Sequence, residues 1–293
     1  MIKRFLKHAG IKPAATSLIG TFSKGECAQR LVAAGFMPAS FGFRAILIGV
    51  IACLFSSTAL ADTVLVAAAS DLSYAINAII PKFQQSTGHK VKLTLGSSGN
   101  FFAQITNGAP FQVFLSADVN YPRQLEKAGK AEPGSTYIYA LGKIVLWVPN
   151  SSKIDIQAKK LQSLLDPSIR KISIGNPAHA PYGRAAVEAM QHAGVYEAVK
   201  FKLVYGENIS QAAQFVQSGA ADIGIIALSL ALGESMRSSG KYWEVPSDMY
   251  MRMEQGAVLI KPASAAARAF YEWMRRPDSR EILSRYGFVT PTP

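Results

Sequence analysis

Residues 63–117 read TVLVAAASDLSYAINAIIPKFQQSTGHKVKLTLGSSGNFFAQITNGAPFQVFLSA, and this stretch decides the fold. Three apolar runs of β type alternate in it with segments of helical period. The runs are TVLVAAA (63–69), VKLTLG (91–96) and QVFLSA (112–117), and the helices begin near residues 71, 99 and 120. Such alternation is typical of parallel βαβ units, whose right-handed crossovers place helices on both faces of one sheet. The sequence therefore predicts an α/β fold.

The first helical segment contains a proline. Ile76, Ile79 and Phe83 fall on one apolar stripe of this helix, as expected for a segment that packs against a sheet. Pro81 has no N–H to donate within a helix, so we expect a kink or a break near Ile80.

A second set of strands and helices begins at residue 143. Its β-type runs are KIVLWVP (143–149), KISIGN (171–176), FKLVYG (201–206), DIGIIAL (222–228) and YWEVPS (242–247). A further strand, GAVLIKP (256–262), precedes two helical segments at 263–276 and 277–287. We therefore predict two hinge-linked lobes, each a mostly parallel sheet flanked by helices, with a cleft between them. Lobe I comprises residues 62–141 plus 253–293, and lobe II comprises residues 142–252.

The first 61 residues have the features of an export leader. Arg44 precedes the apolar run AILIGVIACLF (45–55), and a small-x-small motif ends at Ala61. These features predict a secretory signal peptide that is cut before Asp62, so that residues 1–61 are removed. The apolar run is shorter than the roughly 20 residues that a spanning helix needs, so we expect export without a membrane anchor.

The start of this leader and its cysteines leave alternatives open. Met37 would give a leader of ordinary length, which predicts that translation begins there and not at residue 1. Cys27 and Cys53 are the two cysteines of the sequence, and both lie in the leader. Cleavage before Asp62 leaves a mature chain without a disulfide or a thiolate site, whereas acylation of Cys53 would give a lipid anchor.

The net charge of +12 does not indicate nucleic-acid binding. Residues 1–61 hold seven Lys or Arg and one Glu, and the remaining 24 Lys or Arg are balanced by 18 Asp or Glu. The excess outside the leader is spread over a full-sized globular body and forms no basic run, so we expect no nucleic-acid partner.

No pattern in the sequence proposes an enzyme or a cation site. The chain contains no GxSxG, P-loop, GxGxxG or HExxH pattern, and its histidines lack metal-ligand spacing. Asp71, Asp118 and Asp222 are separated by whole βα units and do not resemble a catalytic pair. We therefore expect a protein that is not an enzyme and that holds neither a cofactor nor a metal cation.

Four short segments place small or hydroxyl-bearing residues where a strand turns into a helix. They are AAASDLSYA (67–75), GSSGNFFAQI (96–105), GNPAHAPYGRAA (175–186) and GENISQAAQF (206–215). A helix N-terminus carries unpaired N–H groups and the positive end of the helix dipole. Because ligands of open α/β sheets bind at the carboxyl ends of strands, these four turns together predict an anion site without a charged side chain.

Each turn also has a structural interpretation. Ser70 suits the N-cap of the helix that follows it, and Tyr182 suits a packing role at the start of its helix. Ser98 belongs to a turn with two hydroxyls and a glycine, which is more than a cap requires. Asn208 reads as an N-cap, and the next residue, Ile209, would then offer its backbone N–H.

The residues quoted above resemble a known family. The segments AAASDLSYA, GSSGNFFAQI, GNPAHAPYGRAAVEAM (175–190), ADIGIIALS (221–229) and FYEWMRRPDSREILSRYGF (270–288) are similar to those of the periplasmic molybdate-binding proteins that serve ABC transporters. The similarity extends over residues 62–293. It implies a two-lobed periplasmic-binding-protein fold of type II and a monomeric periplasmic protein. This protein would capture molybdate, and tungstate too, and deliver it to a membrane permease; the alternative is a receptor for another tetrahedral oxyanion such as sulfate.

The resemblance also implies the site residues. Family members bind the oxyanion through neutral donors, which carry over to the hydroxyls of Ser70 and Ser98 and to the backbone amides of Tyr182 and Ile209. Some members have a tyrosine hydroxyl at the position of Ala227, where this chain has none. One hypothesis is that the hydroxyl of Tyr182 replaces it.

Overall fold

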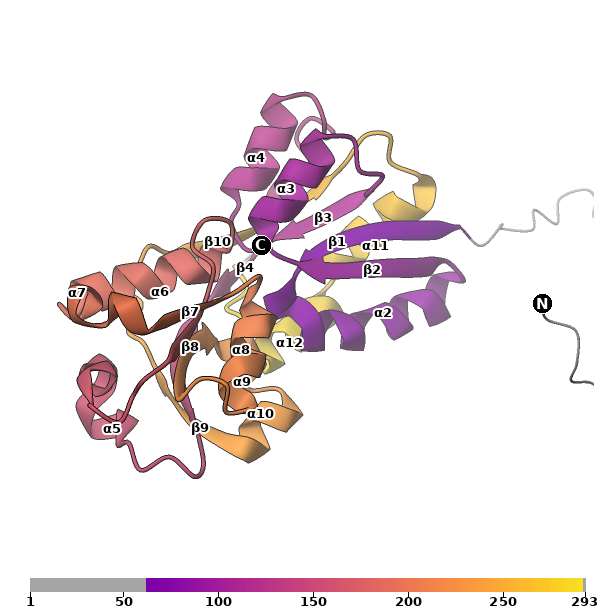
Figure 1. Cartoon of the computed structure of the whole chain (residues 1–293). Helices are drawn as coiled ribbons and strands as arrows, with labels where there is room; N and C mark the ends of the chain where they lie inside the picture. Colours follow the sequence, from indigo (N-terminus) through magenta and orange to yellow (C-terminus); the bar gives the residue numbers. More distant parts are fainter. Residues whose placement is uncertain (1–61, 292–293) are drawn as a thin grey trace, which may run out of the picture. The chain divides into compact units, whose positions relative to one another are not determined.

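The computed structural model describes residues 62–291, so the predicted leader, its cleavage site, Met37 and Cys53 lie outside the described residues. Ten strands of the described part form two five-stranded sheets (Figure 1). The strands of the first sheet are β1 (Thr63–Ala69), β2 (Lys90–Gly96), β3 (Val113–Ser116), β4 (Tyr137–Gly142) and β10 (Met253–Leu259). Those of the second are β5 (Ile144–Pro149), β6 (Ile172–Gly175), β7 (Leu203–Gly206), β8 (Ile223–Ala227) and β9 (Gly240–Glu244).

Helices cover both sheets. The α-helices are α2 (Ser73–Thr87), α3 (Ser98–Thr106), α4 (Asn120–Lys127), α5 (Ile156–Lys159), α6 (Pro181–His192), α7 (Tyr196–Val199), α8 (Ile209–Gln217), α9 (Leu228–Ala231), α10 (Glu234–Ser239), α11 (Ala265–Arg275) and α12 (Pro277–Arg285). Three 3₁₀ turns are η1 (Ser70–Leu72), η2 (Lys160–Leu165) and η3 (Lys200–Lys202). None of the helices in the described part has both the length and the apolar character required to cross a bilayer.

The two sheets have the same topology, with orders β2-β1-β3-β10-β4 and β7-β6-β8-β5-β9. In each sheet three parallel strands are followed by one reversed strand, β10 or β5, and then by a strand that runs with the first three. The predicted two-lobed α/β fold is confirmed, and the reversed strands lie next to the two points where the chain passes between the sheets. We call the part built on the first sheet lobe I and the part built on the second sheet lobe II.

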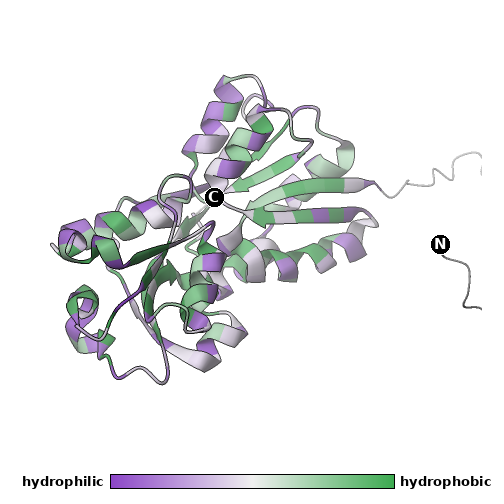
Figure 2. Cartoon of the chain, viewed as in Figure 1, coloured by the Kyte–Doolittle hydropathy of each residue, from purple (hydrophilic) through white to green (hydrophobic). Residues whose placement is uncertain are grey.

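The apolar residues lie where the sequence pattern predicts them (Figure 2). In lobe I, Ile76 and Phe83 of α2 pack with Phe270 of α11 on one face of the first sheet. Phe101 of α3 and Leu125 of α4 belong to a separate cluster on the other face. One continuous cluster forms the core of lobe II. Burial on both faces explains why the central strands β1, β5 and β8 read as continuous apolar runs.

We expected a kink or a break near Ile80, and helix α2 continues through Pro81 to Thr87, so the helix is not broken there. Pro81 and Asn77 are both exposed, which leaves the carbonyl that lost its donor accessible to water. The apolar stripe of the same helix stays fully buried on the opposite side, with Ile76, Ile79 and Phe83 at 0% exposure. This packing outweighs the cost of roughly 3 kcal/mol that a proline imposes inside a helix.

Candidate anion-binding site

Ser70 connects the two lobes. It follows β1 and opens η1, and its Oγ accepts a hydrogen bond from the N–H of Ser210 at 3.2 Å and donates to Oδ1 of Asn208 at 3.1 Å. Ser210 in turn donates its hydroxyl to the carbonyl of Ser70 at 2.9 Å. The Ser70 side chain makes no capping bond to its own helix. Its hydroxyl instead lies at the N-terminus of α8, beside Ile209.

The double-serine turn meets the turn that precedes α6. The carbonyl of His179 accepts hydrogen bonds from the Ser97 hydroxyl at 2.8 Å and from the N–H of Gly99 at 2.9 Å. Ser98 is buried, with 1% exposure, and its Oγ accepts from the N–H of Ala117 at 2.9 Å. The hydroxyl proton of Ser98 is donated to no other group of residues 62–291, so it is available to a ligand.

Two backbone amides complete the set. The N–H groups of Tyr182 and Ile209 lie in the first turns of α6 and α8, and neither donates to another group within the described part of the chain. Asn208 caps α8, as predicted, by accepting from Gln211 N at 3.1 Å. A Cβ added at Gly175, the end of β6, would lie within 4 Å of both Gly183 N and Ile209 Cδ1, which shows how close the two turns are.

The structure thus brings together all four turns that the sequence singled out. Each lies at the carboxyl end of a strand, β1, β2, β6 or β7, and the four face one another across the two lobes. The candidate donors are two neutral hydroxyls and two free amides. Such a set can accept a small anion, because helix N-termini supply positive potential and hydrogen-bond donors without charged groups.

The hydroxyl of Tyr182 points away from this role. It donates to Oδ2 of Asp71 at 2.9 Å and accepts from Nε2 of Gln255 at 2.9 Å. A phenol has one proton, and here it is given to a carboxylate. This geometry argues against the hypothesis that Tyr182 supplies the hydroxyl missing at Ala227.

Asp71 is the most perturbed carboxyl group near the site. It is 0% exposed, and burial raises its pKa to about 6, against the opposing effect of hydrogen bonds from Gln255 and Tyr182. Its main-chain carbonyl accepts from the Ser229 hydroxyl at 2.8 Å. Burial also raises the pKa of Tyr182 well above its usual value, so this phenol stays protonated.

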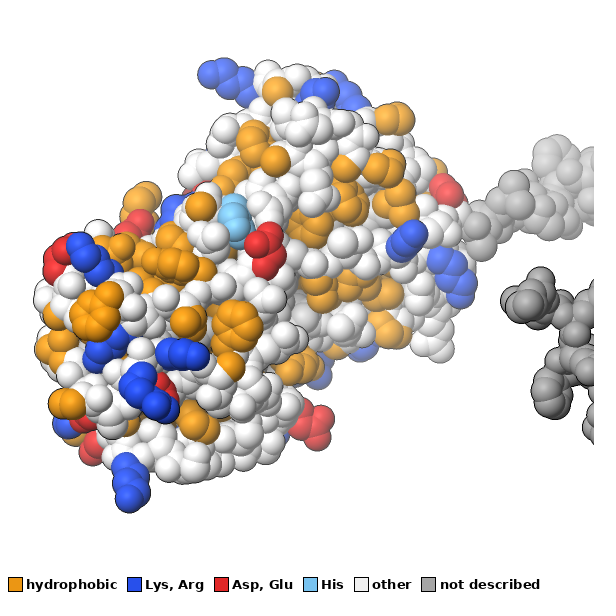
Figure 3. Space-filling view, in the orientation of Figure 1, with side chains coloured by type: hydrophobic (Ala, Val, Ile, Leu, Met, Phe, Trp, Pro, Cys, Tyr) orange, Lys and Arg blue, Asp and Glu red, His pale blue; other side chains and the backbone are white. Residues whose placement is uncertain are grey.

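The lobes are in contact along the mouth of the site. Nδ2 of Asn100 in lobe I donates to Glu207 in lobe II, and the ring of His179, also in lobe II, lies 3.7 Å from the same carboxylate. Figure 3 shows a histidine and an acidic side chain side by side where the two lobes meet. Arg184 of α6 forms an ion pair of 2.6 Å with Asp118 in lobe I. The structure is therefore a closed arrangement of the lobes.

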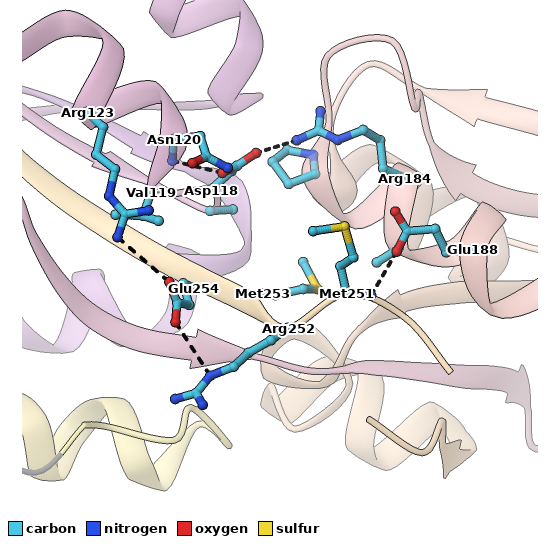
Figure 4. Close-up of a pocket in the computed structure, with 13 residues that line it drawn as sticks. Asp118, Val119, Asn120, Arg123, Arg184, Glu188, Met251, Arg252, Met253 and Glu254 are labelled. Carbon is cyan, nitrogen blue, oxygen red and sulfur yellow. Dashed lines mark hydrogen bonds and ion pairs between the residues drawn. The ribbon is translucent and has the colours of Figure 1, made fainter. Parts of the chain in front are cut away.

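A separate cavity lies beside the chain crossing (Figure 4). It has a volume of about 290 Å³ and is lined from α6, from the start of α4 and from residues 251–254. Arg184 pairs with Asp118, and both Arg123 and Arg252 pair with Glu254. Glu188 also lines the cavity, so three carboxylates balance the three arginines. Because these charges are neutralised within the cavity, it is a poorer anion site than the four turns. Within residues 62–291 no group of three His, Cys, Asp or Glu side chains is arranged to hold a metal ion.

This combination of two α/β lobes and a site of converging helix N-termini is that of a solute-binding protein. The family model for bacterial extracellular solute-binding proteins matches residues 64–289, and the chain belongs to this family. Its relatives include the molybdate-binding protein ModA of Rhodobacter capsulatus, which is 41% identical over 234 residues, 79% of this chain and 90% of the relative. ModA of Azotobacter vinelandii is 38% identical over 251 residues, 85% and 98% of the two chains.

The fold is also that of a solved relative. The structure of the periplasmic molybdate-binding protein of Azotobacter vinelandii matches with a TM-score of 0.72 and 35% identity, and the match covers 78% of this chain and all of the other. The family resemblance predicted from the sequence is confirmed by these matches.

Asp71 and Gln255 were not predicted as part of the site region. Asp71 lies in one of the quoted turns, but its spacing to other acids gave no signal. Gln255 lies 184 residues away in sequence, in β10, where it is fully buried while the neighbouring Glu254 is only partly buried. A polar residue inside a buried strand is the signal that points to it, because such a residue needs a buried partner.

Proposed function

We propose that this chain captures molybdate, and tungstate as well, between its two lobes. One observation carries the proposal: four helix N-termini converge, and they present the hydroxyls of Ser70 and Ser98 and the free amides of Tyr182 and Ile209. The names of the relatives that match over most of the chain give the ligand.

Neutral donors suit a dianion that is fully deprotonated. Hydrogen bonds to a charged group are worth about 1.5–3 kcal/mol each, so a few converging donors offset the cost of removing the ion from water. The unused proton of Ser98 and the two amides present donors only, and such a site rejects an oxyanion that carries a proton. The Ser70 hydroxyl donates to Asn208 in this arrangement, and it would rotate toward a bound ion.

The remaining parts of the proposal concern export and delivery. Residues 1–61 act as the leader, cleavage precedes Asp62, and the mature chain is a periplasmic monomer without a cofactor. Its lobes are residues 62–141 plus 253–293 and residues 142–252, and it hands the oxyanion to the permease of an ABC transporter. N-terminal sequencing of the exported protein tests the cleavage, with Asp62 as the expected first residue.

Isothermal titration of the mature protein with molybdate, tungstate, sulfate and phosphate tests the ligand. We expect tight binding of molybdate and tungstate and much weaker binding of sulfate and phosphate. Sulfate binding as tight as molybdate binding would make the chain a sulfate receptor instead.

A matched pair of serine variants tests the site. Ser98→Ala removes a donor, and we expect it to lower molybdate affinity about tenfold or more. Ser173→Ala is the control, because Ser173 is equally buried and its hydroxyl donates to the backbone of Ala212, within lobe II. Equal affinities of the two variants would remove Ser98 from the site.

A further inference from the structure

A buried hydrogen-bond network lies between the candidate site and the two segments where the chain passes from one lobe to the other. We call Asp71, Tyr139, Tyr182 and Gln255 the hinge network. Gln255 Nε2 donates to Asp71 Oδ2 at 2.7 Å, and its Oε1 accepts from the Tyr139 hydroxyl at 2.7 Å. Tyr182 donates to the same oxygen of Asp71. All four side chains are nearly inaccessible to solvent, with exposures between 0% and 3%.

The network joins the two lobes beside the chain crossings. Asp71 is next to Ser70 in lobe I, Tyr182 lies in the first turn of α6 in lobe II, and Gln255 lies in β10, directly after a chain crossing. The other crossing is adjacent, since a Cβ added at Gly142 would lie 2.5 Å from the Tyr182 hydroxyl and 2.8 Å from Gln255 Nε2. The Asp71–Tyr182 hydrogen bond connects lobe I to lobe II in this closed arrangement.

The role of Asp71 in the network is that of an acceptor. No Lys or Arg of the described chain contacts its carboxylate, so donated hydrogen bonds are what stabilise it. Its Oδ1 is buried and has no hydrogen-bond partner among residues 62–291, while Oδ2 receives both bonds. A neutral amide oxygen in the place of Oδ2 would accept the same two bonds.

We propose that Asp71 is a positioning residue for oxyanion capture: by accepting the Tyr182 hydroxyl, it fixes the first turn of α6 so that the Tyr182 amide faces the site when the lobes close. This inference rests on the proposed function. The tyrosine is the connecting element, since its two ends are the amide at the site and the hydroxyl in the network. A rigid aromatic ring transmits the position of one end to the other.

Tyr182→Phe and Asp71→Asn are the two near-isosteric variants that test the proposal. Tyr182→Phe removes the hydroxyl, and we expect molybdate affinity to fall about tenfold with a faster dissociation rate. Asp71→Asn keeps the acceptor, and we expect it to retain affinity within about threefold of the wild type. Asp71→Ala removes the acceptor and should match Tyr182→Phe, and the double variant Asp71→Ala/Tyr182→Phe should be no weaker than either single variant.

Three results would overturn this role. Asp71→Asn as weak as Asp71→Ala would mean that the acceptor alone is insufficient. An increase in affinity on Asp71→Ala would mean that the Tyr182 hydroxyl, once released, binds the oxyanion directly. Unchanged affinity in Tyr182→Phe would remove the hydroxyl from the mechanism, and this variant suffices if Asp71→Ala does not fold. Failure of the proposed function is a different result, since the wild type itself would then bind none of the oxyanions.

Discussion

Gly183→Ala tests whether the turn before α6 holds a ligand-binding amide. A Cβ at Gly183 would lie 2.0 Å from the carbonyl oxygen of Gly175 and 2.9 Å from the nitrogen of Pro177, both of them backbone atoms. Ordinary contact begins at 3.4 Å, so the first turn of α6 must move by about 1.4 Å. A hydrogen bond of about 2.9 Å from the Tyr182 amide does not survive a shift of that size.

The loss of one hydrogen bond to a charged ligand corresponds to about 10- to 100-fold weaker binding. We therefore expect Gly183→Ala to weaken molybdate binding by this factor in isothermal titration, in addition to lowering the stability by about 1–3 kcal/mol. Gly194→Ala is the control at the other end of the same helix. Its φ of +70° imposes a strain of about 1 kcal/mol on alanine, but its Cβ meets nothing within 4 Å. A folded Gly183→Ala protein with wild-type affinity would refute the role of the Tyr182 amide.

Three further changes have expected outcomes. Gly142→Ala places a methyl group 2.5 Å from the Tyr182 hydroxyl, so it should favour the open form and raise the dissociation rate of molybdate about tenfold in stopped-flow measurements. Arg184→Gln removes the half-exposed ion pair with Asp118, and its effect on that rate should stay below about fivefold and vanish at high salt. Asp71→Asn should flatten the pH dependence of stability. Because the pKa of Asp71 rises from 3.8 unfolded to about 6 folded, its stabilising contribution is complete below about pH 4 and is lost as the pH rises through about 6. Relative to the Asn variant, the wild type should lose up to about 3 kcal/mol across that window in urea titrations, and parallel curves would contradict the assignment.

Hydrophobic patterns in the sequence predicted most of the strands and helices. The alternation of apolar runs and helical segments located nine of the ten strands in residues 62–291 to within a few residues, and it missed β4 (Tyr137–Gly142). The N-cap at Asn208 was visible from its residue type. Of the kink or break that a local rule predicted at Pro81, the break does not occur, because long-range packing maintains the helix. The helix propensity of a single residue contributes little to helix stability where a buried apolar stripe packs the helix against a sheet.

The candidate site was harder to predict, because its contacts join distant parts of the chain. Ser70 was expected either to cap its own helix or to bind an anion, and its hydroxyl contacts residues 138 and 140 positions away. The partners of Asp71 lie 111 and 184 positions away. No periodicity encodes such pairings; they follow from the way the two sheets are placed against each other.

The pairing of β4 with β10 has a consequence for how the chain could be rearranged. Gly142 and Met253 are partners in this ladder, so the segment between them leaves and re-enters the first sheet at one place. The second sheet is thus an insertion whose two ends are already adjacent, and closing them costs little chain entropy. Residues 143–252 could therefore be excised, circularly permuted or exchanged for the equivalent segment of a relative with short joints. A chimaera of this kind would separate the contributions of the two lobes to ligand choice.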